Sequence, residues 1–256
     1  MINLTPGGEQ LEVWRSAASA MPQARVGALL PDFRELVGDA FPGLAAAVGD
    51  EDLVKHCLGP TFGAYQSVEG RVRALTTADF FDLEHGRALY FSLSAIHSSL
   101  RGRGLYEQML LLRIAIGRSL GCEWWATRTQ SPIVAHSFER YGCYPWLDDE
   151  LTPVVATEVA NVLYEQFSAL GRREGEMFNP TTGVLHDAYP TGPYQEVPAV
   201  DNVRVQSQFD AHLESSTGDA LLLVGRLDAM ADRLAPRCDA RFGLPFDRLC
   251  ELLSDL

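Results

Sequence analysis

The sequence predicts an α/β protein built on one mixed central sheet with helices on its faces. Three observations support this fold class: strand-like segments joined by short turns between residues 64 and 96, helical spacing of apolar residues over 105–120, and alternating strand and helix patterns through residue 146. A strand that follows a crossover helix runs parallel to the strand before it. The sheet should therefore combine antiparallel hairpins with a parallel pair.

The first strands are predicted at residues 64–67, 72–81 and 87–96. The connections between them, Glu69-Gly70 and Glu84-His85-Gly86, are short and rich in turn formers, which is typical of antiparallel hairpins. We expect the three strands to be neighbours in the sheet.

The next elements form the predicted crossover. Residues 105–120 carry apolar side chains at helical spacing, and residues 123–129 have the composition of a buried strand. Ser131 and Pro132 then supply a capping residue and a proline suited to the first helical turn. This pattern predicts a helix from there to Tyr141.

The flanking regions have weaker patterns. Residues 9–58 predict three helices, the first carrying Leu11, Val13 and Trp14. Beyond Trp146 the patterns predict a helix at 157–170, a loop-rich stretch at 175–201, a hairpin of 203–213 with 220–226, and closing helices at 228–235 and 246–254. We therefore divide the chain into a core at 1–146 and an acidic extension at 147–256, which is either a degenerate second half or a lid over the substrate.

Charge and composition narrow the classes of function. The net charge is −13, and it divides into −2 for residues 1–146 and −11 for residues 147–256. An acidic surface repels phosphate backbones, so nucleic-acid binding is disfavoured and a cationic or amine-bearing partner is favoured. Solubility alone is the other explanation for such a surface.

No apolar stretch approaches the roughly 20 residues that a membrane span needs. The first residues lack the basic and apolar regions of a signal peptide, so we expect a cytoplasmic protein without membrane partners. Five cysteines, an odd number without a C-x-x-C pair, argue against a disulfide framework and a zinc ribbon. We expect reduced thiols and no metal.

The tetrapeptide Arg101-Gly102-Arg103-Gly104 lies between the strand that ends at Ile96 and the helix that begins at Leu105. Amides at a helix N-terminus have no partner within the helix, and the helix dipole favours an anion there. Glycines allow close approach of a ligand, and arginines add charge for phosphate oxygens. A phosphate-bearing ligand is one interpretation, and a surface turn rich in Arg and Gly is the other.

The residues from Leu93 to Tyr106 resemble the strand-loop-helix signature of the GNAT superfamily of N-acetyltransferases, whose pattern is R/Q-x-x-G-x-G/A after a strand. Further on, Ser131-Pro132 and the segment 137–143 resemble the Asn, the short helix and the Y-E-K-x-G-F sequence of that family. The resemblance covers about residues 64–146. It implies a GNAT fold with two splayed parallel strands, followed here by a C-terminal extension.

The resemblance also implies an acyl-CoA cofactor, acetyl-CoA first. Ala95 and Ile96 would pair by main chain with the pantetheine arm, and Ser131 would contact the arm from the other side. The pyrophosphate would be cradled by the six residues Arg101, Gly102, Arg103, Gly104, Leu105 and Tyr106. In the family an amine attacks the thioester directly, without a covalent enzyme intermediate.

Three residues depart from the pattern of the family. Tyr106 stands where Gly or Ala is usual, and Cys143 stands where Phe is usual. Phe138 stands where the family often has a tyrosine that protonates the departing thiolate. Tyr141, one helical turn further, is the candidate substitute, although a thiol of pKa ~8.5 is a tolerable leaving group unaided.

An amine of pKa ~10.4 must lose its proton before or during attack, so a carboxylate or imidazole is needed near the opening. His97, at the end of the motif strand, is the first candidate for this base, followed by Glu123 and then His136. Each of them could equally serve a structural role. The pair His56-Cys57 is disfavoured as a nucleophilic site because nothing near it in the sequence orients it.

The sequence therefore predicts an acyltransferase that moves an acyl group, acetyl first, from CoA to the amine of a small molecule. One alternative is a GNAT-like enzyme that processes acyl-CoA or acyl-carrier-protein substrates in a biosynthetic pathway, for example by decarboxylation. Another is a CoA-binding module without catalysis. Acceptor, acyl length and oligomeric state are left open by the sequence.

Overall fold

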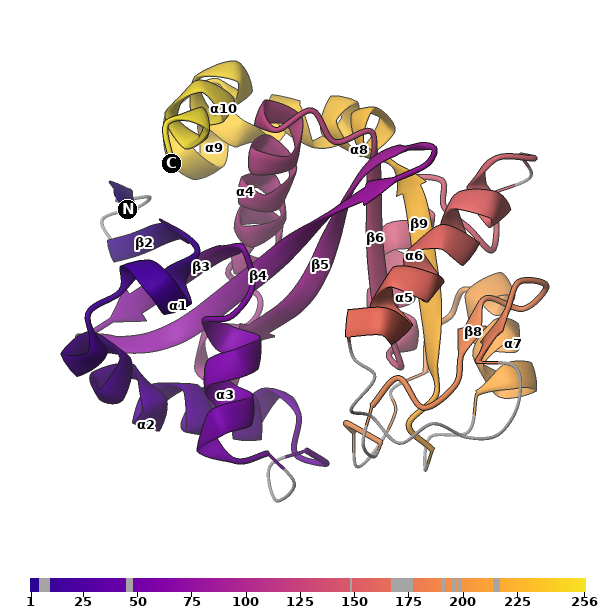
Figure 1. Cartoon of the computed structure of the whole chain (residues 1–256), viewed down its shortest axis with the longest axis horizontal. Coiled ribbons are helices and arrows are strands. Elements are labelled where there is room, and N and C mark those ends of the chain that lie inside the picture. Colours follow the sequence, from indigo (N-terminus) through magenta and orange to yellow (C-terminus); the bar gives the residue numbers. More distant parts are fainter. Residues whose placement is uncertain are drawn as a thin grey trace.

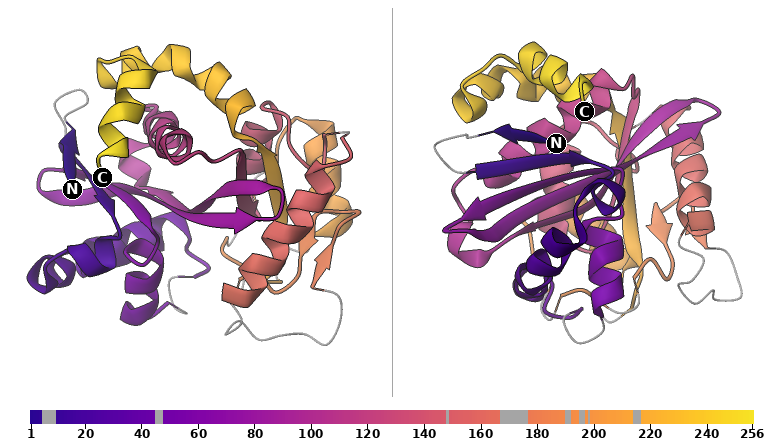
Figure 2. Two further views of the ribbon diagram at one scale, coloured as in Figure 1. Left: turned by 45° about the horizontal axis from the view of Figure 1, so that its top comes forward. Right: turned by 60° about the vertical axis from the view of Figure 1, so that its left-hand side comes forward.

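The fold centres on a mixed sheet, which the computed structural model shows with helices on both faces (Figures 1 and 2). The described residues are 1–4, 10–44, 48–147, 149–166, 177–189, 192–194, 197, 199–213 and 217–256. Among them, nine strands form one sheet in the order β1-β2-β3-β4-β5-β6-β9-β8-β7. The strands are β1 (Ile2–Leu4), β2 (Gln10–Arg15), β3 (Phe62–Val68), β4 (Arg71–Leu83), β5 (Gly86–Ile96), β6 (Trp124–Thr129), β7 (Phe178–Asn179), β8 (Val184–Leu185) and β9 (Ala220–Arg226).

The helices cover the sheet in two groups. The longer helices are α2 (Gln23–Ala40), α3 (Asp50–Cys57), α4 (Leu105–Ser119), α5 (Pro132–Glu139), α6 (Thr152–Gln166), α7 (Val203–His212), α8 (Leu227–Leu234) and α10 (Phe246–Ser254), with the short α1 (Ala17–Ala20) and α9 (Cys238–Phe242) beside them. One core cluster joins the sheet to α4, α5, α7, α8 and α10. On the opposite face, α2 with α3 and α6 cover separate parts of the sheet (Figure 2).

The predicted hairpins and crossover are confirmed. β3, β4 and β5 are antiparallel neighbours, and β6 pairs parallel with β5 after α4. The helix predicted to run to Tyr141 ends at Glu139, and its N-cap is Ser131, whose side chain accepts from the Val134 amide. The predicted fold class, a mixed sheet flanked by helices, is therefore the observed one.

The prediction of a helix around Leu11, Val13 and Trp14 is wrong, because these residues lie in β2, which pairs antiparallel with β3. Leu11 and Val13 pack into the core on the α4 face, whereas Trp14 packs under α2. A strand that is buried on both faces lacks the alternation that identifies most strands. Its run of apolar residues therefore resembled part of a helix.

The C-terminal part belongs to the same sheet. β9 pairs antiparallel with β6 from Arg226 opposite Trp124 to Leu221 opposite Thr129, so the boundary predicted at residue 146 does not divide the sheet. The hairpin predicted for 203–213 with 220–226 is wrong, because 203–212 form α7, whose N-cap Asn202 accepts from the Val205 amide. The short β8 pairs with β9 instead.

Other predictions for this region are met in part. The helix predicted at 157–170 corresponds to α6, which begins earlier, and 167–170 lie outside the described residues. The closing helices are confirmed by α8 and α10, both packed against α4. All five cysteines are free thiols, and four of them are buried. Among the described residues, no helix has the length and apolar character that crossing a membrane requires.

Gly225 shows how tightly β9 is built into the core. It lies opposite Trp125, and a Cβ atom there would come within 2.7 Å of the Trp125 ring and 2.8 Å of the Gly142 carbonyl oxygen. Overpacking of this kind costs about 1–3 kcal/mol. We expect Gly225→Ala to lower the free energy of unfolding by that amount in urea titrations.

Gly27→Ala is the matched control. Gly27 lies inside α2, and a Cβ atom there would meet nothing within 4 Å. Alanine should stabilise this helix by about 0.4–1 kcal/mol. If Gly225→Ala unfolds at the same or a higher urea concentration than the unaltered chain, the close fit of β9 against β6 is contradicted.

Candidate active site

The parallel strands β5 and β6 separate near their C-terminal ends. Their pairing runs from Ala88 opposite Trp124 to Phe91 opposite Thr127 and then stops. β5 nevertheless continues to Ile96 and β6 to Thr129. Residues 92–96 of β5 therefore keep their pairing with β4 but have an open edge towards β6.

A β-bulge in β5 lies at the point of separation. Phe91 pairs with Ala78 of β4 and Leu93 pairs with Thr77, so Ser92 is an extra residue on β5. Such a bulge bends its strand and increases its twist. The bend turns the end of β5 away from β6.

The bulge also reverses the faces that β5 side chains meet. Leu89 and Phe91 pack on the α4 face of the sheet, whereas Leu93 and Ala95 pack under α2 and α3. Side chains alternate along a strand, so one inserted residue exchanges the two faces beyond it. The gap between β5 and β6 can thus be lined from both faces.

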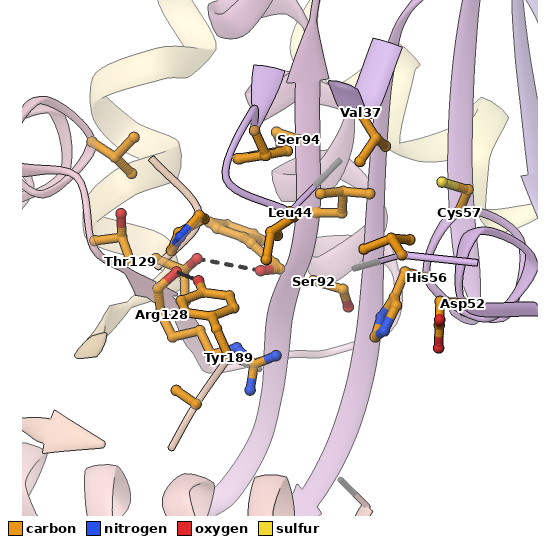
Figure 3. A pocket seen from close by; sticks show the side chains of 18 of the residues that line it. Val37, Leu44, Asp52, His56, Cys57, Ser92, Ser94, Arg128, Thr129 and Tyr189 are labelled. Carbon is orange, nitrogen blue, oxygen red and sulfur yellow. Dashed lines mark hydrogen bonds between the residues drawn. The ribbon is translucent and has the colours of Figure 1, made fainter. Parts of the chain in front are cut away.

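A cavity of about 360 Å³ lies in this gap (Figure 3). Its volume is within the range of small-molecule sites. β5 contributes Phe91 to Ser94, and β6 contributes Thr127 to Thr129. The other lining residues are Val37, Phe41, Leu44, Val48, Asp52, Leu53, Lys55, His56, Cys57, Tyr106, Arg113, Val134, Phe138, Ala188, Tyr189, Pro193 and Tyr194.

The cavity is basic although the chain is acidic. Arg113, Arg128 and Lys55 line it, with Asp52 as its one carboxylate among the described lining residues. A ligand inside meets these nearby charges more strongly than the distant acidic surface, because screening weakens interactions beyond about 8–10 Å. The net charge of the chain is therefore a poor guide to what this cavity binds.

His56 of α3 points towards the cavity in Figure 3. Burial lowers the pKa of its imidazole below 6.5, and the charges of Arg128 and Lys55 lower it further. The ring is therefore neutral at neutral pH and can accept a proton. The neighbouring Cys57 is fully buried, and burial raises the pKa of its thiol to about 12, so it is a poor nucleophile.

Arg113 of α4 reaches the cavity from the other face of the sheet. Its side chain is 2% exposed, and its guanidinium carbon lies 4.1 Å from the centre of the Phe91 ring. Nε and Nη2 are buried, and no described residue offers them a hydrogen-bond partner. The guanidinium hydrogen-bonds with the Tyr106 hydroxyl, and burial lowers its pKa to about 10, so it stays charged at neutral pH.

The loop before α4 has the backbone that an anion site requires. Gly102 and Gly104 have φ of +80° and +78°, and Gly104 is the N-cap of α4. Within the described residues, the amides of 102–107 take part in none of the hydrogen bonds found outside regular helices and strands. The preceding Ser98 anchors the loop to α2, because its amide and hydroxyl donate to Asp39 at 2.7 and 2.8 Å.

Two further arginines join this loop from the C-terminal segment. Arg237 and Arg241 both form ion pairs with Glu107 in the first turn of α4. The Arg241 guanidinium lies against Gly104, 2.4 Å from where a Cβ atom would stand. With Arg101, which is 3.3 Å from Asp39, and Arg103, the N-terminus of α4 carries four arginines.

The residues predicted to bind the cofactor lie around the gap. Ala95 and Ile96 are on the open stretch of β5, and residues 101–105 form the loop and the start of α4. Tyr106 lines the cavity, where its ring meets that of Phe138 edge-on at 6.4 Å. The hydroxyl of Ser131 caps α5 and hydrogen-bonds with Tyr194.

The residues predicted to be catalytic lie outside the cavity lining. His97 hydrogen-bonds Ser99 through Nδ1 at 2.8 Å and caps a short turn. Glu123 is exposed at the opposite end of β6, 3.8 Å from Arg226. The hydroxyl of Tyr141 accepts from Arg140 at 2.7 Å. Their catalytic roles stay predictions.

His136, the third candidate base, also lies outside the cavity lining, on exposed α5 surface beside Asn202 at 3.0 Å. Arg113, Tyr194 and Arg241 were not predicted from the sequence as site residues, and His56 was disfavoured. None of these residues stands in a motif. A charged residue at position 113, in the otherwise buried face of a helix, was the one signal that could have drawn attention.

The sequence matches no protein-family model and no curated protein. Several solved structures are similar to this chain. An IAA acetyltransferase from Bacillus cereus has 10% identity and a TM-score of 0.42 over 84% of this chain and 99% of its own. Aminoglycoside 6'-acetyltransferase type Ii has 10% identity and a TM-score of 0.41 over 84% and 97%.

A third similar structure is N-acetylglutamate synthase from Neisseria gonorrhoeae, complexed with coenzyme A and N-acetylglutamate. It has 12% identity and a TM-score of 0.43, and the match covers 85% of this chain but 35% of the synthase. The chain thus spans about a third of that protein. At such identities and TM-scores, likeness alone assigns neither family nor function.

Proposed function

We propose that this chain is an acyl-CoA-dependent N-acyltransferase of the GNAT type, which transfers an acyl group to the amine of a small molecule. The observation that carries the proposal is the separation of β5 from β6 at a bulge, with a cavity in the gap and an arginine-rich loop at the start of α4. This arrangement offers a place for each part of an acyl-CoA.

The open edge of residues 92–96 can pair with the amides of a pantetheine arm as another strand would. The amides of 102–107 and the arginines around them supply hydrogen bonds and charge for the pyrophosphate. Arg241 is exposed enough to move from Gly104 onto a phosphate.

His56 is the proposed base for the acceptor amine. The amine nitrogen forms a bond with the thioester carbonyl carbon, the carbon–sulfur bond breaks, and the amine proton passes to the His56 imidazole. Tyr106 lines the cavity, and burial raises the pKa of its hydroxyl, so it keeps a proton that it can donate to the thiolate. It is a better-placed donor than Tyr141.

Binding is tested by thermal melting with CoA, acetyl-CoA and longer acyl-CoAs. A ligand at 100 times its dissociation constant should stabilise the fold by about 2.7 kcal/mol. Transfer is then tested with a panel of amines by detection of free thiol, which should appear only when both acyl-CoA and an amine are present.

Three results would separate the alternatives. Stabilisation without amine-dependent thiol release would indicate a CoA-binding module. Stabilisation by a pantetheine-loaded carrier protein alone would indicate a carrier-dependent enzyme. Absence of any stabilisation by CoA, acyl-CoA or loaded carrier would overturn the proposal.

A further inference from the structure

Arg113 is a buried charge that the transfer reaction does not use. It is 2% exposed, and it forms none of the ion pairs found among the described residues. Its hydrogen bond with the neutral Tyr106 hydroxyl leaves Nε and Nη2 without partners among the residues that the structure describes. Buried charges are normally paired, so an unpaired one at a cavity wall indicates a missing anion.

Arg113 lies where the acyl end of the proposed donor would reach. Arg113 is eight positions after Leu105, which places it about 12 Å along α4 from the phosphate loop. Its guanidinium stacks on Phe91, the last residue of β5 that pairs with β6. The charge therefore lies on the same face as the loop, at the closed end of the gap. His56 and Asp52 approach the cavity from α3 on the other face.

We propose that the acyl group of the donor ends in a carboxylate, as in malonyl or succinyl thioesters, and that Arg113 binds this carboxylate. The inference rests on the proposed function and specifies its substrate class. The two free groups, Nε–H and Nη2–H, are neighbours on one edge of the guanidinium and can hold both oxygens of a carboxylate.

Tyr106 is the positioning residue for this site. It stands where the resembled family has Gly or Ala, and its hydroxyl oxygen accepts a hydrogen bond from the Arg113 guanidinium. The carboxylate takes no part in the transfer: the amine–carbon bond forms at the thioester carbonyl, sulfur leaves as the thiolate, and the distal carboxylate stays ionised. Arg113 therefore selects and orients the donor.

The test compares succinyl-CoA with butyryl-CoA, which has the same chain length without the carboxylate, by isothermal titration calorimetry. Leaving one partner of a buried charge pair unmatched typically costs at least 30-fold in affinity. We expect the unaltered chain to bind succinyl-CoA or malonyl-CoA at least 30-fold more tightly than butyryl-CoA. Arg113→Met should abolish this preference and leave butyryl-CoA binding unchanged or stronger.

Methionine in place of a buried, unpaired arginine should leave the fold intact, because apolar replacement of buried charges is often neutral or stabilising. Arg118→Met, on the exposed side of the same helix, is the control and should keep the preference. If CoA and butyryl-CoA bind but succinyl-CoA and malonyl-CoA bind no more tightly than butyryl-CoA, the carboxylate site is wrong and the acyltransferase proposal stands. If no CoA species binds, the proposed function itself fails.

Discussion

Gly104→Val is expected to abolish CoA binding. The residue has φ of +78°, a conformation that a β-branched residue adopts only with strain, and its Cβ would lie 2.4–2.5 Å from the Arg241 guanidinium. Arg241 can swing away from the valine, so the decisive effect is on the backbone: a β-branched side chain drives position 104 out of its left-handed conformation and moves the amides that converge there. Thermal melting should show that the roughly 2.7 kcal/mol of stabilisation at 100 times the original dissociation constant falls to near zero.

Gly121→Val separates loss of the site from loss of stability. Gly121 follows the other end of α4 with φ of +70°, and a Cβ there would meet nothing within 4 Å. Valine at either glycine should cost about 1–3 kcal/mol of backbone strain. Stabilisation by CoA should persist in Gly121→Val, and the role of the loop is refuted if CoA stabilises both variants equally.

His56→Gln is expected to lower kcat by about 10²- to 10⁴-fold, the usual contribution of a general base, with little change in CoA affinity. Steady-state kinetics with an amine from the panel, together with CoA titration, measures both quantities. His136→Gln is the matched control, because His136 is exposed on α5 outside the cavity lining. A kcat for His56→Gln within a factor of three of the unaltered value would count against this base.

The pH dependence of the reaction rate should reflect the protonation of His56. The pKa of His56 is lowered from 6.5 in the folded chain. The reaction rate should therefore rise as the pH rises through this lowered pKa. At higher pH, where the imidazole is already neutral, the titration of His56 should change the rate no further. The unfolded chain takes up the proton first as pH falls, so the His56 contribution to stability declines below about pH 6.5. Both effects should be absent in His56→Gln.

The elements around the site could be predicted because their signals are local. The turn glycines between β3, β4 and β5, the apolar spacing of α4 and the Ser131-Pro132 helix start each lie within a few residues of what they specify. The two wrong assignments had no such signals. β2 is buried on both faces, and the short α7 buries Val205 and Phe209, four residues apart, within a polar sequence.

The proposed anion site at the start of α4 lies in consecutive residues, since two glycines and a helix N-terminus suffice to bring amides together. The chemical character of the cavity could not be predicted from a local segment, because its walls come from residues far apart in the chain. Arg113 stands out only in the folded chain, where Phe91 covers one face of its guanidinium and no carboxylate of the described residues reaches it. Arg241 reaches Gly104 only through the packing of α8 to α10 on α4. Burial and charge pairing depend on which side chains meet in space, and spacing along the chain does not report that.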